Sequence, residues 1–252
     1  MPAEQSCAIV LRVVDFSETS CVVTLFSRDF GKISGLAKGG RRPKGPFESA
    51  LDLLALVHIV FLRKSSDALD LLTEAKLLKR FRGKPGELES IYAGYYVAEL
   101  LMRLTDEYDP HPDLFEIAEQ TLSALARDGA TPAIVLQFEL ALLRLLGHFP
   151  VLDRCSECGD RVTDETTNRS TIPFGLLSGG ALCERCRPGK PHVLRVAAST
   201  LATLDAFGTR QAEPANGAVG ETGERDELRN EQVDFDRRTH AEIRRIVNGY
   251  LV

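Results

Sequence analysis

Two pairs of cysteines constrain this chain more than any other feature of its sequence. Cys155 and Cys158 are separated by two residues, as are Cys183 and Cys186, and twenty-four residues lie between the two pairs. A C-x-x-C turn directs two thiolates toward one point, and four thiolates in a tetrahedron are a common ligand set for Zn²⁺. The intervening loop is longer than usual, but loop closure costs only slightly more free energy as a loop lengthens. The sequence therefore predicts one zinc site with these four ligands.

The predicted zinc is structural, because four cysteine ligands leave no open coordination position for a substrate. Four arginines near the pairs could offset the negative charge of a tetrathiolate zinc centre: Arg154, Arg161, Arg185 and Arg187. Redox exchange between the pairs is an alternative, although no thioredoxin-like βαβ pattern surrounds them. Six cysteines in 252 residues are too few for a disulfide scaffold, which favours a reducing compartment, and the cytoplasm is the expected location.

A second unusual stretch is KGGRRPKG, residues 38–45, which concentrates positive charge in an acidic protein. Its four cations stand among three glycines and one proline: Lys38, Arg41, Arg42 and Lys44. The formal net charge of the chain is −5, yet residues 1–82 carry thirteen lysines and arginines against nine acids, a net of +4. The remaining residues carry eighteen against twenty-seven, a net of −9. This asymmetry predicts that an anionic partner binds the N-terminal part alone.

Further cations of the N-terminal part are candidates for the same partner: Arg28, Lys32, Lys79, Arg80 and Arg82. A charged loop beside a small β-barrel is typical of proteins that bind single-stranded nucleic acid, where cations follow the backbone and side chains stack on bases. Four phenylalanines are candidate stacking residues, although most of them are expected in the core: Phe16, Phe26, Phe30 and Phe47. A solvated loop with no partner is the alternative interpretation.

The hydrophobic pattern of the N-terminal part predicts a small barrel. Short runs rich in Val, Ile, Leu and Phe predict three strands within residues 7–37, one within 51–62 and one within 68–78. Five short strands in about eighty residues suit a barrel whose curvature is set by bulges and glycines.

From Glu87 onward the pattern changes to that of helices. Helices are predicted over 87–104, 113–129 and 131–147, the third with Thr131 as its N-cap, and again over 192–207 and 238–252. In the first helix the spacing predicts an apolar stripe: Leu88, Ile91, Tyr92, Tyr95, Val97, Leu100 and Leu104. Residues 211–236 carry eight acids and two arginines and are predicted to be a disordered insertion.

The chain is thus predicted to be a multi-domain α+β protein. A five-stranded β-barrel over residues 1–82 precedes a helical domain over 83–252, which contains the zinc-binding motif at 150–190 and the acidic insertion. The sequence predicts neither a signal peptide nor a segment long and apolar enough to cross a membrane. The five histidines are scattered, and no nucleophile elbow, Walker lysine or H-E-x-x-H motif is found. No catalytic residue and no small-molecule substrate are therefore predicted.

The order of basic barrel, helical bundle and four-cysteine site resembles the RecO family of DNA repair proteins. Three segments carry the resemblance: LAKGGRRPKG, FELALLRLLGHFPVLDRCSECG and FGLLSGGALCERC. The resemblance covers about residues 5–207 and implies that the barrel is an OB-fold. By position, Lys38, Arg41, Arg42 and Lys44 match the family's basic loop, and the four paired cysteines match its zinc ligands.

The resemblance also implies a function. Family members bind single- and double-stranded DNA and anneal complementary strands without hydrolysing nucleotides. With the partner RecR they help to load RecA onto strands covered by single-strand-binding protein, and some bind the acidic C-terminal tail of that protein on the helical domain. The main alternative for this chain is a zinc-dependent enzyme or thiol switch with the barrel as a recognition module. A zinc-ribbon interaction scaffold without nucleic acid is a third reading.

Overall fold

The computed structural model describes seven stretches of the chain: residues 3–42, 45–47, 50–64, 69–130, 132–162, 170–210 and 237–251. Lys44, the predicted N-cap Thr131 and the predicted insertion at 211–236 lie outside the described residues. The chain divides into two compact units, Met1–Phe138 and Glu139–Val252, which are considered separately below. The predicted domain boundary between residues 82 and 83 stays a prediction.

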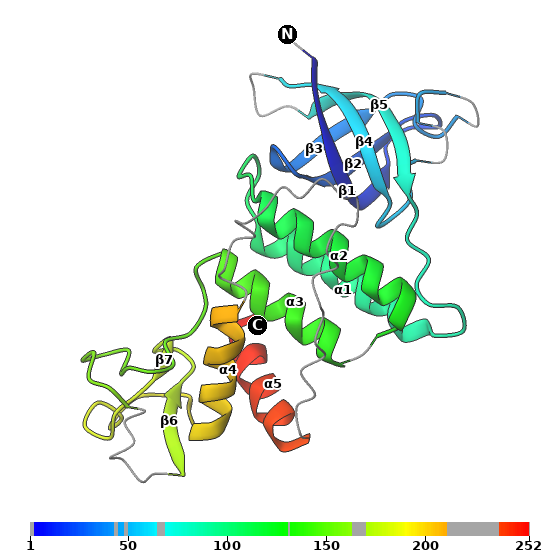
Figure 1. Ribbon diagram of the computed structural model, residues 1–252. Coiled ribbons are helices and arrows are strands. Elements are labelled where there is room, and N and C mark those ends of the chain that lie inside the picture. Colours follow the sequence, from blue (N-terminus) through cyan, green and yellow to red (C-terminus); the bar gives the residue numbers. More distant parts are fainter. Residues whose placement is uncertain are drawn as a thin grey trace, which may run out of the picture. The chain divides into compact units, whose positions relative to one another are not determined.

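Five strands form the predicted barrel at the N-terminus (Figure 1). Their bounds are β1 Ala3–Asp15, β2 Cys21–Ser27, β3 Gly31–Ala37, β4 Leu56–Leu62 and β5 Asp70–Lys79. They close in the order β1-β2-β3-β5-β4, with β3 and β5 parallel and the other pairs antiparallel. Alternate residues such as Val23, Leu25 and Ile33 point into the barrel and form its core. The predicted OB-like class is confirmed.

Irregular backbone bends the strands into the barrel. The register of β1 with β2 shifts between Val10 and Arg12, and the register of β4 with β5 shifts at two places. The predicted strand at 51–62 begins only at Leu56, because the residues before it form a turn that is hydrogen-bonded to β1. There Leu54 donates its backbone N–H to the carbonyl of Val10 at 2.8 Å, with a φ of +63°. Bulges and this turn supply the predicted curvature.

Three helices follow the barrel: α1 Leu88–Leu104, α2 Pro112–Asp128 and α3 Pro132–Leu145. The apolar stripe predicted for α1 is wrong at Leu88, Tyr92 and Tyr95, which are exposed. The helix instead buries small residues such as Ala93 and Gly94. An added Cβ at Gly94 would lie 2.6 Å from the ring of Phe81. The buried face of α1 is therefore set by small residues that permit close packing and not by the most hydrophobic side chains.

The segment after α1 is held against β3. The backbone N–H of Tyr108 donates to the carbonyl of Lys32 at 2.9 Å, and the Tyr108 hydroxyl donates to the carboxylate of Asp70. Burial and the hydrogen bond to Asp70 raise the pKa of Tyr108. The guanidinium of Arg63 lies 4.0 Å from the centre of the same ring. These contacts make residues 105–109 part of the wall of the barrel where β3 and β5 share only three residue pairs.

The second unit contains a small sheet that the sequence did not predict. Strands β6 Thr171–Gly175, β7 Gly180–Ala181 and β8 Val193–Ala197 pair in the order β7-β6-β8. Residues 193–197 are therefore strand, and the predicted helix at 192–207 begins later, as α4 Ala198–Arg210. The last helix is α5 Arg237–Leu251, whose Arg244 Nη1 donates to the buried Glu139 Oε1 of α3 at 2.6 Å. Among the described residues, no helix is long and apolar enough to span a membrane.

Replacing Gly31 by alanine should destabilise the barrel strongly. Gly31 has a φ of +67°, and an added Cβ would lie 2.0 Å from the backbone oxygen of Asp109. Left-handed backbone costs other residues about 1–2 kcal/mol, and the clash adds about 1–3 kcal/mol, so Gly31→Ala should lower the free energy of unfolding by about 2–5 kcal/mol. Urea denaturation measures the loss.

Gly86→Ala is the matched control, because Gly86 has a φ of +80° with no atom within 4 Å of an added Cβ. It should show the backbone cost alone, about 1–2 kcal/mol. Equal losses in the two variants would contradict the close packing of residues 105–109 on β3.

Candidate metal centre and nucleic-acid interface

The four paired cysteines come together in the second unit. Their sulfur atoms all lie within 4.8 Å of one another, and the Sγ atoms of Cys158 and Cys183 are 3.8 Å apart. A tetrahedral zinc ion with Zn–S bonds of about 2.3 Å requires sulfurs about 3.8 Å apart. The cluster therefore fits the predicted metal ion, and all four positions of a tetrahedron are supplied by the chain.

Backbone hydrogen bonds shape the two turns that present the sulfurs. In the first turn the N–H of Gly159, at a φ of +76°, donates to the carbonyl of Cys155 at 2.9 Å. In the second, the N–H groups of Cys186 and Arg187 both donate to the carbonyl of Cys183 at 3.1 Å. The N–H of Ser156 donates to the carbonyl of Ala181 at 2.9 Å, which ties the first turn to the strand that leads to the second.

The turns favour the thiolate form at Cys155 and Cys183 but not at Cys158 and Cys186. Burial alone would raise the pKa of the Cys155 thiol, but backbone hydrogen bonds from Cys183, Cys158 and Glu157 lower this pKa to about 6. Hydrogen bonds with neighbouring sulfurs, first that of Cys183, raise the pKa of Cys186 to about 12. Protons are thus shared unevenly within the cluster. A bound zinc ion would displace them, because metal ligation requires the thiolate form.

One of the four neighbouring arginines faces the sulfurs. The carboxylate of Asp160, followed by the thiolates of Cys183 and Cys158, raises the pKa of Arg185. Arg185 also pairs with Asp160 of the first turn, so it links the two halves of the cluster. Arg154 pairs with Asp153 at 3.4 Å, and Arg187 pairs with Glu184 at 3.4 Å. The backbones of Arg154 and Arg161 form an isolated antiparallel β-bridge. The predicted charge compensation therefore rests mainly on Arg185.

The basic segment of the barrel lies against the turn between β1 and β2. The backbone N–H of Arg41 donates to the carbonyl of Thr19 at 3.1 Å, and that of Gly39 to the hydroxyl of Ser20 at 3.4 Å. Gly40 is tightly packed, since an added Cβ would lie 2.9 Å from the Sγ of Cys21. These contacts fix residues 38–42, which we call the basic loop, on the rim of the barrel.

The cations of the basic loop are exposed. Within the described stretches, neither Lys38 nor Arg42 has a carboxylate at ion-pair distance. Arg41 Nη1 lies 3.1 Å from Asp15 Oδ2 and donates to the carbonyl of Ser17 at 3.3 Å. The side chains of Arg41 and Asp15 are 44% and 67% exposed, so the pair is worth about 0–1 kcal/mol and a phosphate could replace the carboxylate.

The other predicted cations are mostly engaged within the first unit. Arg28 pairs with Glu116 at 2.7 Å, and Arg80 pairs with Asp52 at 2.8 Å. The ammonium of Lys32 donates to the carbonyl of Met102 at 2.7 Å and to that of Thr105, so it stabilises the C-terminus of α1. Lys79 Nζ donates to Ser123 Oγ at 2.7 Å, and Arg82 is exposed. Their contacts with DNA stay a prediction.

The strand register separates the basic loop from Lys79, Arg80 and Arg82. Ala37, at the end of β3, pairs with Leu72, and β5 continues seven residues further before it reaches Lys79. At about 3.3 Å per residue, this is about 23 Å along the strand. The structure therefore does not gather Lys79, Arg80 and Arg82 beside the basic loop.

Only one of the four candidate stacking rings is exposed. Phe26 is buried against Phe115, with ring centres 6.3 Å apart, and Phe47 is buried in the barrel core. Phe30 meets the ring of Phe61 edge-on at 5.3 Å. Phe16, which directly follows β1, is 65% exposed. The expectation that most of these rings lie in the core agrees with these positions.

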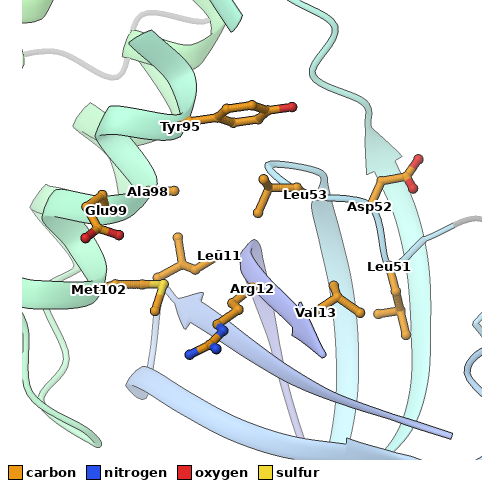
Figure 2. Close-up of a pocket in the computed structure, with 10 residues that line it drawn as sticks. All are labelled: Leu11, Arg12, Val13, Leu51, Asp52, Leu53, Tyr95, Ala98, Glu99 and Met102. Carbon is orange, nitrogen blue, oxygen red and sulfur yellow. The ribbon is translucent and has the colours of Figure 1, made fainter. Parts of the chain in front are cut away.

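A groove of about 480 Å³ lies between α1 and the barrel (Figure 2). Its lining is largely apolar and comes from β1, the turn before β4, and α1: Leu11, Val13, Leu51, Leu53, Tyr95 and Met102. Two carboxylates at the groove are paired elsewhere, Asp52 with Arg80 and Glu99 with Arg103. Arg12 also lines it and has no carboxylate at ion-pair distance within the described part of the chain. Sequence reasoning missed this groove, because its walls come from three separate segments.

Two family models match the chain and together cover most of it. The model described as Recombination protein O N terminal matches residues 1–81, and the model described as Recombination protein O C terminal matches residues 85–251.

Relatives named DNA repair protein RecO match over most of their length. The relative from Rhodopirellula baltica is 46% identical over 207 residues, which cover 82% of this chain and 74% of the relative. The relative from Anaeromyxobacter sp. (strain K) is 37% identical over 196 residues, 78% of this chain and 75% of its own. The relative from Halalkalibacterium halodurans is 30% identical over 200 residues, which cover 79% of this chain and 75% of the relative.

We expect one tightly bound zinc ion per chain, measured by elemental analysis of the purified protein. Cys155→Ser should abolish zinc retention, because it removes one of four ligands and leaves an incomplete tetrahedron. Cys7→Ser is the matched control, since Cys7 lies in β1, outside the cluster, and this variant should keep its zinc. Full zinc retention by Cys155→Ser would contradict the assignment of these ligands.

Proposed function

Because the chain belongs to the RecO family of DNA repair proteins, we propose that it binds single- and double-stranded DNA through its barrel and anneals complementary strands. The observation that supports the proposal best is the basic loop on the barrel rim, where Lys38 and Arg42 are exposed with no carboxylate at ion-pair distance within the described residues. Lys44 belongs to the same proposed site by its position in the sequence.

The proposed mechanism is electrostatic. Two approaching DNA strands repel each other through their phosphates, and cations on the barrel lower this repulsion by neutralising both backbones. The bases are left free to pair. Arg41 can exchange its weak surface pair with Asp15 for a phosphate, because both groups are already in contact with water. Annealing in this scheme makes and breaks no covalent bond, so no catalytic residue is required.

The zinc site takes a structural part in this proposal. The four cysteines would hold the ion, and zinc would join the two turns of the second unit that present them. A zinc-dependent reaction would need an open coordination position, whereas the chain supplies four sulfur ligands.

Two protein partners follow from the family. We propose that the chain acts with RecR to load RecA onto strands covered by single-strand-binding protein. We further propose that the acidic C-terminal tail of that protein binds the groove beside α1. The groove is apolar apart from a few side chains, and Arg12, which pairs with no carboxylate of the described residues, offers a cation to the tail.

The double variant Lys38→Ala/Arg42→Ala should bind single-stranded DNA more weakly and with less dependence on salt. Each lost phosphate contact should flatten the slope of log affinity against log salt by about 0.7, so the double variant should lose about 1.4. Fluorescence anisotropy titrations at several salt concentrations measure both quantities. The control is Arg103→Ala, which removes an exposed cation of α1 that pairs with Glu99. An unchanged affinity and slope in the double variant would contradict the proposal.

Strand annealing tests the activity itself. Complementary oligonucleotides should anneal faster with the wild-type protein than without it, both when bare and when coated with single-strand-binding protein. The double variant should be slower in both assays, because fewer phosphates are neutralised at the barrel. Equal annealing with and without the wild-type protein would rule out this part of the proposal.

Arg12→Ala should weaken binding of a synthetic peptide that carries the tail of single-strand-binding protein. Loss of a charge-assisted hydrogen bond costs about 1.5–3 kcal/mol, which corresponds to about 10- to 150-fold in affinity. Calorimetry measures the change, with Arg195→Ala of β8 as the control, since Arg195 pairs with Glu184 in the second unit. Equal affinities of wild type and Arg12→Ala would remove the groove as the docking site.

A further inference from the structure

An aliphatic row crosses four strands on the outside of the barrel. In the strand register, Val14 of β1 pairs with Val22 of β2, Val22 pairs with Leu36 of β3, and Leu36 pairs with Leu71 of β5. Residues that alternate with them, such as Cys21, Ala37 and Leu72, belong to the barrel core. The four members of the row therefore face outward, and we call them the outer row.

The outer row is accessible to a ligand. Val14 is 42% exposed, and Val22, Leu36 and Leu71 are half-buried. Residues just beyond three of the strands extend this surface. Phe16 directly follows β1 and is 65% exposed, Lys38 directly follows β3 and is exposed, and Leu69 directly precedes β5 and is 37% exposed. An aromatic ring and a cation thus border an apolar strip.

The basic loop is tied to the turn that carries Phe16. Arg41 contacts the residues on both sides of Phe16, through Asp15 Oδ2 at 3.1 Å and the carbonyl of Ser17 at 3.3 Å. The backbone of the loop is tied to the same turn through Thr19. Three contacts, to Asp15, Ser17 and Thr19, therefore hold Arg41 at the turn that carries the exposed ring of Phe16.

We infer that Phe16 is a base-stacking residue and that the outer row carries the unpaired bases of a single strand, whose phosphates lie on the basic loop. The inference rests on the proposed function and deepens it, since it assigns single-stranded DNA to a surface of its own. An apolar strip bordered by exposed cations suits a polyanion with apolar faces. Bases of single strands expose such faces, whereas those of a duplex are covered by their neighbours.

Phe16→Ala should lower the affinity for a thymidine oligonucleotide about 5- to 150-fold, the range that loss of one stacked base produces. The slope of log affinity against log salt should not change, because the phenyl ring carries no charge. Affinity for a blunt duplex should stay within about twofold of wild type. Leu177→Ala is the matched control, since Leu177 is a 71% exposed apolar residue of the second unit.

A spectroscopic test reports stacking directly, because the chain contains no tryptophan. In Phe16→Trp the indole is the only tryptophan, and a thymidine oligonucleotide should quench its fluorescence while affinity is retained. Leu177→Trp should show no quenching under the same conditions. Circular dichroism of each variant checks that the barrel is folded.

The outcomes separate the inference from the proposed function. Reduced affinity of Phe16→Ala at an unchanged salt slope, with quenching in Phe16→Trp, supports the inference. Salt-dependent binding by the wild type, with equal affinity in Phe16→Ala and no quenching in Phe16→Trp, overturns the inference and leaves the proposed function standing. Absence of any salt-dependent DNA binding by the wild type overturns both.

Discussion

The packing of the basic loop on the β1–β2 turn is the constraint on which the proposed nucleic-acid interface depends. A loop of glycines and cations would otherwise sample many conformations, and its charges would repel one another. Gly40 permits the approach because a side chain there would meet the sulfur of Cys21, itself buried in the core. The hydrogen bond from Arg41 to Thr19 then sets the direction of the loop. The hydrophobic core thereby positions a surface charge.

The same barrel shows how a protein of negative net charge can keep a cationic surface. Arg28 and Lys32 attach the barrel to the helices through Glu116 of α2 and a carbonyl of α1, and Arg80 pairs with Asp52 in the turn before β4. The cations of the basic loop stand apart from these attachments. Charge in this unit therefore divides into a structural part and an exposed part, and the four-cysteine cluster is a separate feature of the second unit.

Much of this architecture follows from local sequence patterns, and the rest depends on long-range contacts. Short runs rich in Val, Ile, Leu and Phe predict β2 and β3, and cysteine spacing predicts the metal cluster, because each signal is contained in a few neighbouring residues. The buried face of α1 was misjudged, since hydrophobicity favours Tyr92 while close packing selects Gly94. Strands β6 and β8 were missed because such five-residue segments become strands only through a distant partner, and β7 has only two residues. The exposure of Phe16 among similar phenylalanines likewise needs the fold.

Hydrogen–deuterium exchange of the whole chain, with and without single-stranded DNA, tests the central claim most directly. The account predicts that DNA slows amide exchange in the β1–β2 turn, in the basic loop and along β3, while the zinc-cluster turns exchange as before. Protection confined to the second unit, with none in the barrel, would contradict the claim that the barrel rim is the nucleic-acid interface.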